Sequence, residues 1–128
     1  MYTLIVRASF EAAHDIPGHK GKCKNLHGHT YKLEAEFSGA DLDEIGMLTD
    51  FSDLKAVLNE FLPDHVYLNE VVSFSTTAEN LSRWIFEQLQ GRGLPVSAVT
   101  LWETERNGCR YTPGNDNYLR TTAAQRIK

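Results

Sequence analysis

The sequence predicts an α+β fold, in which an antiparallel sheet of four strands packs one apolar face against two helices. Apolar and polar residues alternate in two segments near the N-terminus and in two segments near residue 100, as is typical of strands with one buried face. Between them, two segments repeat apolar residues with the period of a helix. The predicted order is therefore ββααββ, in a single domain that covers residues 1–128.

The first two strands are predicted on either side of a loop rich in Gly, Pro and Lys. Residues 2–13 alternate between a polar face and an apolar face that carries Val6 and Phe10, and His14 is the next residue on the apolar face. The second strand runs from about residue 27 to residue 37. Its apolar face consists of Tyr31, Leu33, Ala35 and Phe37.

The two helices follow the first pair of strands. The first is predicted at roughly residues 51–62, with Asp50 as its N-cap. The second begins at the segment TTAE, in which Thr76 and Glu79 have the spacing of a capping box, and it continues to about Gln90. The apolar stripes of the two helices include Leu54, Leu58, Leu81 and Ile85.

The second pair of strands is predicted as a hairpin. Residues 96–105, VSAVTLWETE, form its first strand, and the chain turns at Asn107 and Gly108 into a short strand, CRYT. A sheet of four strands has two open edges, so we expect association with other copies of the chain.

The charge of the chain argues against a polyanionic partner. Thirteen basic and seventeen acidic residues give a net charge of −4, which offers no overall attraction to nucleic acid or to an anionic membrane. No apolar stretch approaches the length that spans a bilayer, and the N-terminus does not resemble a signal peptide. We therefore expect a cytoplasmic protein, with disorder only in its C-terminal tail.

Three histidines are candidates for a metal site. His27 and His29 are two residues apart on a predicted strand, so their imidazoles point to the same side. If the first two strands pair as a hairpin, His14 lies opposite the start of the second strand. Three imidazoles are typical of catalytic zinc, which keeps a fourth position open, although other divalent metals also fit. The alternative is that these are ordinary strand histidines.

Cys23 lies four positions before His27 and has three possible roles. It could be a fourth zinc ligand in a closed structural site, a nucleophile or base, or an inert thiol. The flanking residues Lys22 and Lys24 place it in a polar loop rather than in a core, which disfavours the inert thiol.

Six segments together resemble the 6-pyruvoyltetrahydropterin synthase family, over residues 9 to about 111. They are FEAAH, CKNLHGH, GMLTDFSDLK, DHVYLN, TTAEN and WETE, in this order. The three residues between the cysteine and HGH resemble the branch that makes 6-carboxytetrahydropterin, because the gap is longer in the biopterin enzymes. The tail after YTPG is longer than in the family.

The resemblance implies a tunnelling fold, in which the sheets of several subunits join into a barrel. The subunits form trimers that stack into hexamers. It also implies one zinc ion per subunit, bound by His14, His27 and His29, with Cys23 as the catalytic thiol.

Four further residues match functional positions of the family. Asp64 and His65 match the other members of a catalytic triad, which a neighbouring subunit contributes. Glu103 matches the carboxylate that anchors the pterin, and Thr77 matches a position that contacts the substrate. Without the resemblance, a solvated pair is the commoner meaning of Asp64 and His65. Composition alone favours Glu103 as an exposed residue of a short edge strand.

The activity implied by the resemblance is that of a zinc-dependent lyase. It would convert 7,8-dihydroneopterin triphosphate to 6-carboxy-5,6,7,8-tetrahydropterin, acetaldehyde and triphosphate in queuosine biosynthesis. His19, Lys20, Lys22 and Lys24 form a basic cluster that we expect to attract the triphosphate, unless it is merely a solvated loop.

Two other functions remain open. The first is a related pterin side-chain lyase, such as one that makes 6-pyruvoyltetrahydropterin. The second belongs to another class, a zinc-binding module without catalysis, in which the metal is closed off by His14, Cys23, His27 and His29.

Overall fold

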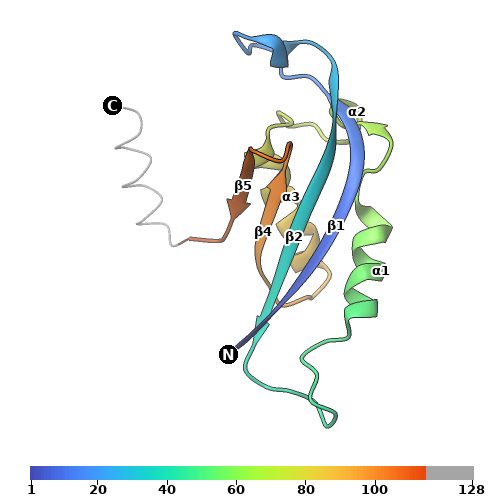
Figure 1. Ribbon diagram of the computed structural model, residues 1–128, viewed down its shortest axis with the longest axis vertical. Helices are drawn as coiled ribbons and strands as arrows, with labels where there is room; N and C mark the ends of the chain where they lie inside the picture. Colours follow the sequence, from blue (N-terminus) through green and yellow to red (C-terminus); the bar gives the residue numbers. More distant parts are fainter. Residues whose placement is uncertain (115–128) are drawn as a thin grey trace.

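A computed structural model describes residues 1–114 of the chain. Its centre is a sheet with the strand order β3-β1-β2-β4-β5, and helices cover one of its faces (Figure 1). The predicted α+β class and the ββααββ order of the main elements are confirmed. The strands are β1 (Tyr2–His14), β2 (His27–Gly39), β3 (Val66–Tyr67), β4 (Val96–Trp102) and β5 (Gly108–Tyr111). The helices are η1 (Lys22–Lys24), α1 (Phe51–Phe61), α2 (Leu68–Val71) and α3 (Ala78–Gly91).

The expectation of four antiparallel strands is wrong in one respect, because the short strand β3 adds a fifth. Val66 and Tyr67 pair in parallel with Ala12 and Ala13 of β1. Two residues are too few to show an alternating pattern, so no periodicity could reveal this strand. The single turns η1 and α2 escaped prediction for the same reason.

The helix starts agree with the sequence in one case and differ in the other. Asp50 caps α1 as predicted, because its side chain accepts a hydrogen bond from the backbone N–H of Ser52 at 2.8 Å. The N-cap of α3 is Thr77, which accepts from the N–H of Asn80, and not Thr76. Thr76 is completely buried, and its polar groups are directed at His14.

The long hairpin of β1 and β2 organises the core. Its thirteen residue pairs run without a bulge from Tyr2 opposite Gly39 to His14 opposite His27. Buried residues recur at alternate positions of both strands, and residues that face each other across an antiparallel pair lie on the same side. One side of the hairpin therefore carries its buried residues. This side packs against α1 and α3, which therefore lie on one face of the sheet.

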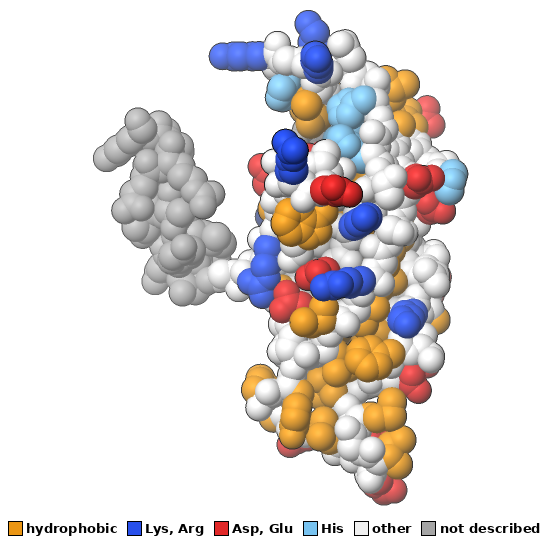
Figure 2. Space-filling view, viewed as in Figure 1, with side chains coloured by type: hydrophobic (Ala, Val, Ile, Leu, Met, Phe, Trp, Pro, Cys, Tyr) orange, Lys and Arg blue, Asp and Glu red, His pale blue; other side chains and the backbone are white. Residues whose placement is uncertain are grey.

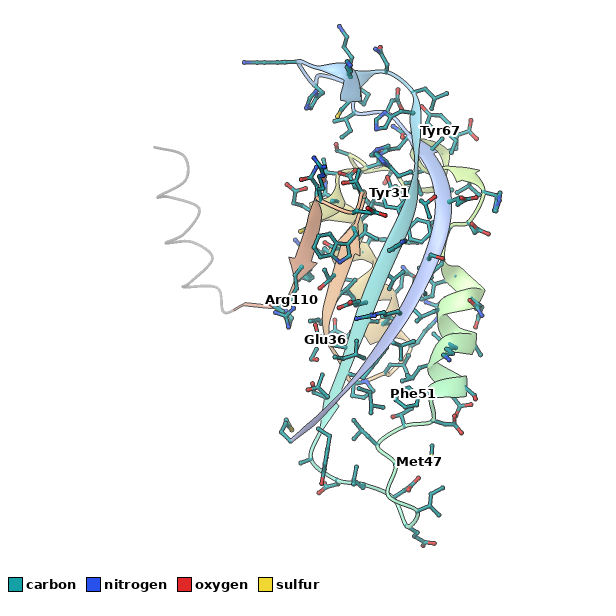
Figure 3. The ribbon with its side chains drawn as sticks, in the orientation of Figure 1. Tyr31, Glu36, Met47, Phe51, Tyr67 and Arg110 are labelled. Carbon is teal, nitrogen blue, oxygen red and sulfur yellow. The ribbon has the colours of Figure 1, made fainter. Side chains whose placement is uncertain are left out.

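The opposite face of the sheet is open to solvent and carries charged side chains among apolar ones (Figure 2). The exposed apolar residues of this face include Ile5 and Trp102. Arg7 of β1 pairs with Glu34 of β2 at 3.0 Å, and Arg110 of β5 reaches Glu36 of β2 at 3.1 Å (Figure 3). Solvent-exposed pairs of this kind add little stability. The fold is therefore held mainly by the buried face, as in other antiparallel sheets with one solvated side.

Two further observations concern the surroundings of the chain. Within the described residues, β3 covers the outer edge of β1 only at Ala12 and Ala13, so most of this edge is open to another strand.

No helix among these residues is both long and apolar enough to cross a membrane. Our expectations for the C-terminal tail lie outside the described residues.

We expect Leu101→Ala to lower the free energy of unfolding by about 3 kcal/mol, because it leaves a cavity in the core. Leu101 is fully buried on β4, opposite Leu33. The matched control is Leu26→Ala at a side chain that is 65% exposed, for which we expect a change within about 0.5 kcal/mol. Denaturant unfolding measures both, and equal losses would contradict the assignment of the core.

Candidate metal and active site

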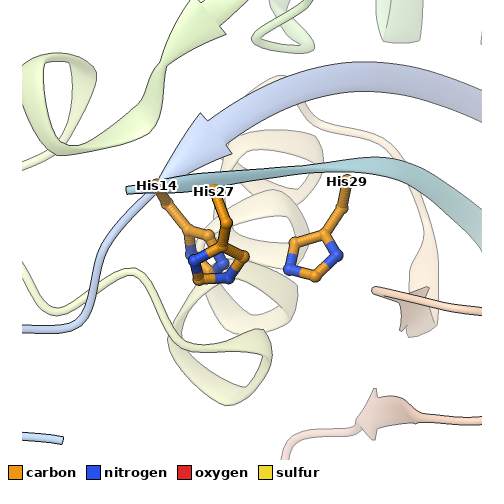
Figure 4. A group of neighbouring side chains, drawn as sticks. All are labelled: His14, His27 and His29. Atoms are coloured by element: carbon orange, nitrogen blue, oxygen red, sulfur yellow. The ribbon is translucent and has the colours of Figure 1, made fainter. Parts of the chain in front are cut away.

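Three histidines from the two long strands meet at the end of the hairpin (Figure 4). The possible ligand atoms of His14, His27 and His29 all lie within 4.8 Å of one another. The register explains this arrangement, because His14 stands directly opposite His27, and His29 is the next residue on the same face of β2. Three imidazoles at this spacing can hold one metal ion.

Hydrogen bonds fix the orientation of two of these rings. The Nδ1–H of His14 donates to the carbonyl of Thr76 at 2.8 Å, and that of His27 donates to the carbonyl of Asn25 at 2.7 Å. Because a carbonyl only accepts, the neutral form of each ring has its proton on Nδ1 and a lone pair on Nε2. Backbone partners of this kind commonly orient metal-binding histidines.

Two of the remaining nitrogens of the cluster lack hydrogen-bond partners. Nε2 of His14 and Nε2 of His29 are buried, and neither makes a hydrogen bond within the described residues. Burial lowers the pKa of both histidines below its usual value, although the carboxylate of Glu103 opposes this effect. Both rings are therefore neutral at neutral pH, which is the form that binds metal. Unpaired buried nitrogens in this form suit a metal ion.

Glu103 lies beside the cluster. The strand expected over residues 96–105 ends at Trp102, and the backbone N–H of Glu103 donates to the carbonyl of Asn107 in the turn. The carboxylate nevertheless points toward the histidines, with Oε2 at 3.6 Å from Nε2 of His14 and 3.8 Å from Nε2 of His29. Its side chain is 26% exposed, so the carboxylate can accept hydrogen bonds from a molecule that enters from solvent.

Cys23 lies in η1, within the loop that joins β1 to β2, and it is a half-buried free thiol. Its carbonyl accepts a hydrogen bond from Ile16 at 2.8 Å, which closes the loop. In the part of the chain that the structure describes, the group of neighbouring metal-binding side chains contains the three histidines and not Cys23. A site closed by four ligands is therefore not formed in this arrangement.

Asp64 and His65 form a pair that lies away from the cluster. Oδ2 of Asp64 is 2.8 Å from Nδ1 of His65, and its Oδ1 accepts from the backbone N–H of Glu11 at 2.9 Å. Nε2 of His65 is 3.5 Å from the carboxylate of Glu11, which projects from the face of β1 opposite to His14. The structure therefore does not bring this pair to the histidine cluster of its own chain.

The backbone and the charges of this pair are unusual. His65 has a φ of 56°, in the left-handed region, where only a few per cent of residues other than glycine occur. Its hydrogen bond to Asp64 raises the pKa of His65. The pKa of Asp64 is lowered, first by the hydrogen bond from the backbone of Glu11 and then by His65. Strained backbone and shifted pKa values often mark functional sites.

The structure adds two residues to the site that the sequence did not single out. Thr76 holds the ring of His14. The sequence suggested a different role for Thr76, because its spacing from Glu79 is that of a capping box. Tyr31 packs edge-on against His14 and His29, and its buried hydroxyl lacks a hydrogen-bond partner among the described residues. The hydroxyl of Thr77 accepts from Asn80, so the structure gives it a capping role.

The fold and the cluster define an α+β protein with a candidate metal centre, and comparison with known proteins gives its family. Residues 3–114 match the family model described as 6-pyruvoyl tetrahydropterin synthase, so the chain belongs to this family. The family expected from the sequence is confirmed, and so is the expectation that the chain is an enzyme of the lyase class.

Three proteins illustrate the similarity. A 6-carboxy-5,6,7,8-tetrahydropterin synthase of Haemophilus influenzae is 37% identical over 87% of this chain and 99% of its own length. One of Synechocystis sp. with the same name is 38% identical over 87% of this chain and 93% of its own length. The solved 6-pyruvoyl tetrahydropterin synthase of Caenorhabditis elegans has a TM-score of 0.78 and 29% identity, covering 88% of this chain and 96% of its own.

We expect Asp64→Asn to lower the pKa of His65 toward 6.5, because the hydrogen bond and the charge of Asp64 are the main causes that raise it. In the wild-type protein His65 stays protonated to a higher pH than a free histidine, and in the variant it should lose its proton earlier. NMR titration of the His65 ring measures the change. Glu11→Gln is the control, with a smaller decrease, since Glu11 is the weakest cause. A larger effect of Glu11→Gln would contradict the assignment.

Proposed function

We propose that the chain is a zinc-dependent lyase that converts 7,8-dihydroneopterin triphosphate to 6-carboxy-5,6,7,8-tetrahydropterin, acetaldehyde and triphosphate, in queuosine biosynthesis. One observation carries this proposal: the histidine cluster with two buried, unpaired Nε2 atoms beside Glu103. The similarity to relatives named 6-carboxy-5,6,7,8-tetrahydropterin synthase over most of the chain supports the choice of product.

The metal ligands in this proposal are His14, His27 and His29. A set of three imidazoles suits zinc and leaves a fourth position for substrate. Bound zinc would polarise the side-chain hydroxyls of the pterin and so lower the barrier to removing nearby protons. The residues of the chain then have to hold the ring of the substrate and transfer the protons.

Glu103 is proposed to anchor the pterin ring. Adjacent N–H groups of a pterin can donate two parallel hydrogen bonds to one carboxylate, and such pairs are both strong and specific in geometry. The carboxylate lies within 4 Å of two cluster histidines, so a pterin bound to it would be close to the residues that would hold the metal. Thr77, at the start of α3, is proposed as a weaker contact of the substrate.

Cys23 is proposed as the base that takes a proton from the substrate side chain. Its position outside the group of metal-binding side chains leaves the thiol free for this task. The loop around it also carries the exposed basic cluster of His19, Lys20, Lys22 and Lys24. Figure 2 shows Lys or Arg side chains next to His side chains at one end of the molecule. A triphosphate that enters at this end meets the positive charge.

Asp64 and His65 are proposed to complete the site of a neighbouring subunit. Because they lie on the far side of β1 from their own cluster, proton transfer to Cys23 requires a second copy. A hollow of about 570 Å³ adjoins His65 and is lined in part by Glu11 and Tyr67, which leaves room for groups of such a copy. The open edge of β1 supports the joining of sheets from several copies into a barrel. We propose a hexamer of two trimers, as the resemblance to the family implies.

Two alternatives differ from this proposal in what they require. A lyase that makes 6-pyruvoyltetrahydropterin could use the same metal and thiol, and the similar Caenorhabditis elegans structure bears that name. A zinc module without catalysis would need Cys23 as its fourth ligand, and this thiol is not grouped with the histidines. It would also give no role to Glu103 or to the pair of Asp64 and His65.

We expect Cys23→Ala to keep its fold and its zinc while losing at least about 100-fold in turnover, because it removes the base and no ligand. His27→Ala, in contrast, should lose the metal. Metal analysis, circular dichroism and an activity assay on both variants measure these effects. If Cys23→Ala lost its zinc and unfolded, the protein would be a structural zinc module.

The product distinguishes the two lyases. We expect wild-type protein with 7,8-dihydroneopterin triphosphate to release acetaldehyde and 6-carboxy-5,6,7,8-tetrahydropterin, identified by mass spectrometry. The zinc-stripped protein is the control and should release neither. A pyruvoyl product without acetaldehyde would assign the chain to the other branch of the family.

A further inference from the structure

A network of hydrogen bonds connects His14 to α2, the short helix after β3. The carbonyl of Thr76 accepts the Nδ1–H of His14 at 2.8 Å, and the hydroxyl of Thr76 lies 3.2 Å from the same nitrogen. This hydroxyl is in turn 3.3 Å from Oδ1 of Asn69 and 3.3 Å from the carbonyl of Asp15. His14 and Thr76 are both completely buried, so water does not compete for the bond between them.

Asn69 holds the residue that directly follows His14. Its Oδ1 accepts from the backbone N–H of Asp15 at 3.2 Å, and its Nδ2 donates to the backbone carbonyl of Asp15 at 2.9 Å. Strand β1 ends at His14, so the backbone groups of Asp15 lie beyond the regular ladder. The side-chain amide of Asn69 takes the place of a neighbouring strand there, and it fixes the backbone from which the imidazole of His14 projects.

Tyr67 strengthens the same connection from the end of β3. Its hydroxyl donates to the carboxylate of Asp15 at 2.6 Å, close to the end of the hairpin (Figure 3). Two residues of one segment therefore hold Asp15. Tyr67 binds the side chain of Asp15, and Asn69 binds its backbone. That segment begins with Asp64 and His65.

We infer that Asn69 is a positioning residue for the metal ligand His14. The inference rests on the proposed zinc site and deepens it. Among the described residues, the hydrogen bonds of the Asn69 side chain go to Asp15 and Thr76, and none goes to Nε2 of His14 or to Glu103. Asn69 acts on Asp15 and Thr76, which set the place and the rotation of the His14 ring before metal binds. A cluster that is ordered in advance binds metal more tightly than one that the metal must order.

The test compares zinc affinity in variants of α2. Chelator competition on the full chain should give a dissociation constant for zinc that is about 10- to 100-fold higher in Asn69→Ala than in the wild-type protein. The control is Glu70→Ala, at the next residue of the same helix, where the side chain is exposed and should leave the constant within about twofold.

A second variant covers the case in which Asn69→Ala does not fold. Asn69→Asp has the same size and keeps the accepting oxygen, but it replaces the donor to the carbonyl of Asp15 by an oxygen. It should also weaken zinc binding, and the NMR signal of the His14 Nδ1–H in metal-free protein should broaden or shift in it.

The outcomes separate this inference from the proposed function. If folded Asn69 variants have a lower melting temperature but bind zinc as the wild-type protein does, Asn69 has only a structural role and the inference is wrong. If the wild-type protein itself does not bind zinc, both the inference and the zinc-dependent function are wrong. Weaker zinc binding in the Asn69 variants with an unchanged Glu70→Ala control supports the inference.

Discussion

The register between β1 and β2 is the constraint on which the rest of the site depends. It pairs thirteen residues in succession and ends with His14 opposite His27. A shift by one residue would turn every side chain of one strand to the other face, moving Phe10 into solvent and His14 away from the cluster. The stacking of Phe10 on Tyr31, with ring centres 4.9 Å apart, belongs to the same register. One set of pairings thus builds both the apolar core and the candidate metal site at the end of the hairpin.

The candidate site residues lie in two different environments, one buried and one exposed to solvent. Imidazoles that extend from the core are partly removed from water, which keeps them neutral and leaves their Nε2 atoms unpaired. Leaving such atoms buried without partners costs free energy. Asp64 and His65, in contrast, are exposed and hold a charged pair together by a short contact. Strand β1 therefore lies between a group of buried nitrogens that suits a metal ion and an exposed charged pair.

Alternation made the common face of the three histidines predictable from the sequence, because parity along a strand determines the face on which a side chain lies. Glu103 lies beyond the end of β4, and its assignment came from the resemblance to the family. The roles of Thr76 and Asn69 were not predictable in this way. Both act through contacts between residues more than fifty positions apart, and no local pattern encodes such a contact. The left-handed backbone of His65 and the short strand β3 also depend on pairing with β1 rather than on their own sequence.

The position of His65 on the far side of β1 has a consequence for how activity depends on concentration. All three candidate metal ligands come from one chain, so a single subunit can be loaded with metal alone. In the proposed assembly, the proton-transferring pair arrives only with a neighbour. Dilution that separates the subunits would then leave a protein that is fully loaded with metal but inactive. The specific activity would depend on the fraction of subunits in the assembly, which follows the law of mass action, and not on the metal content.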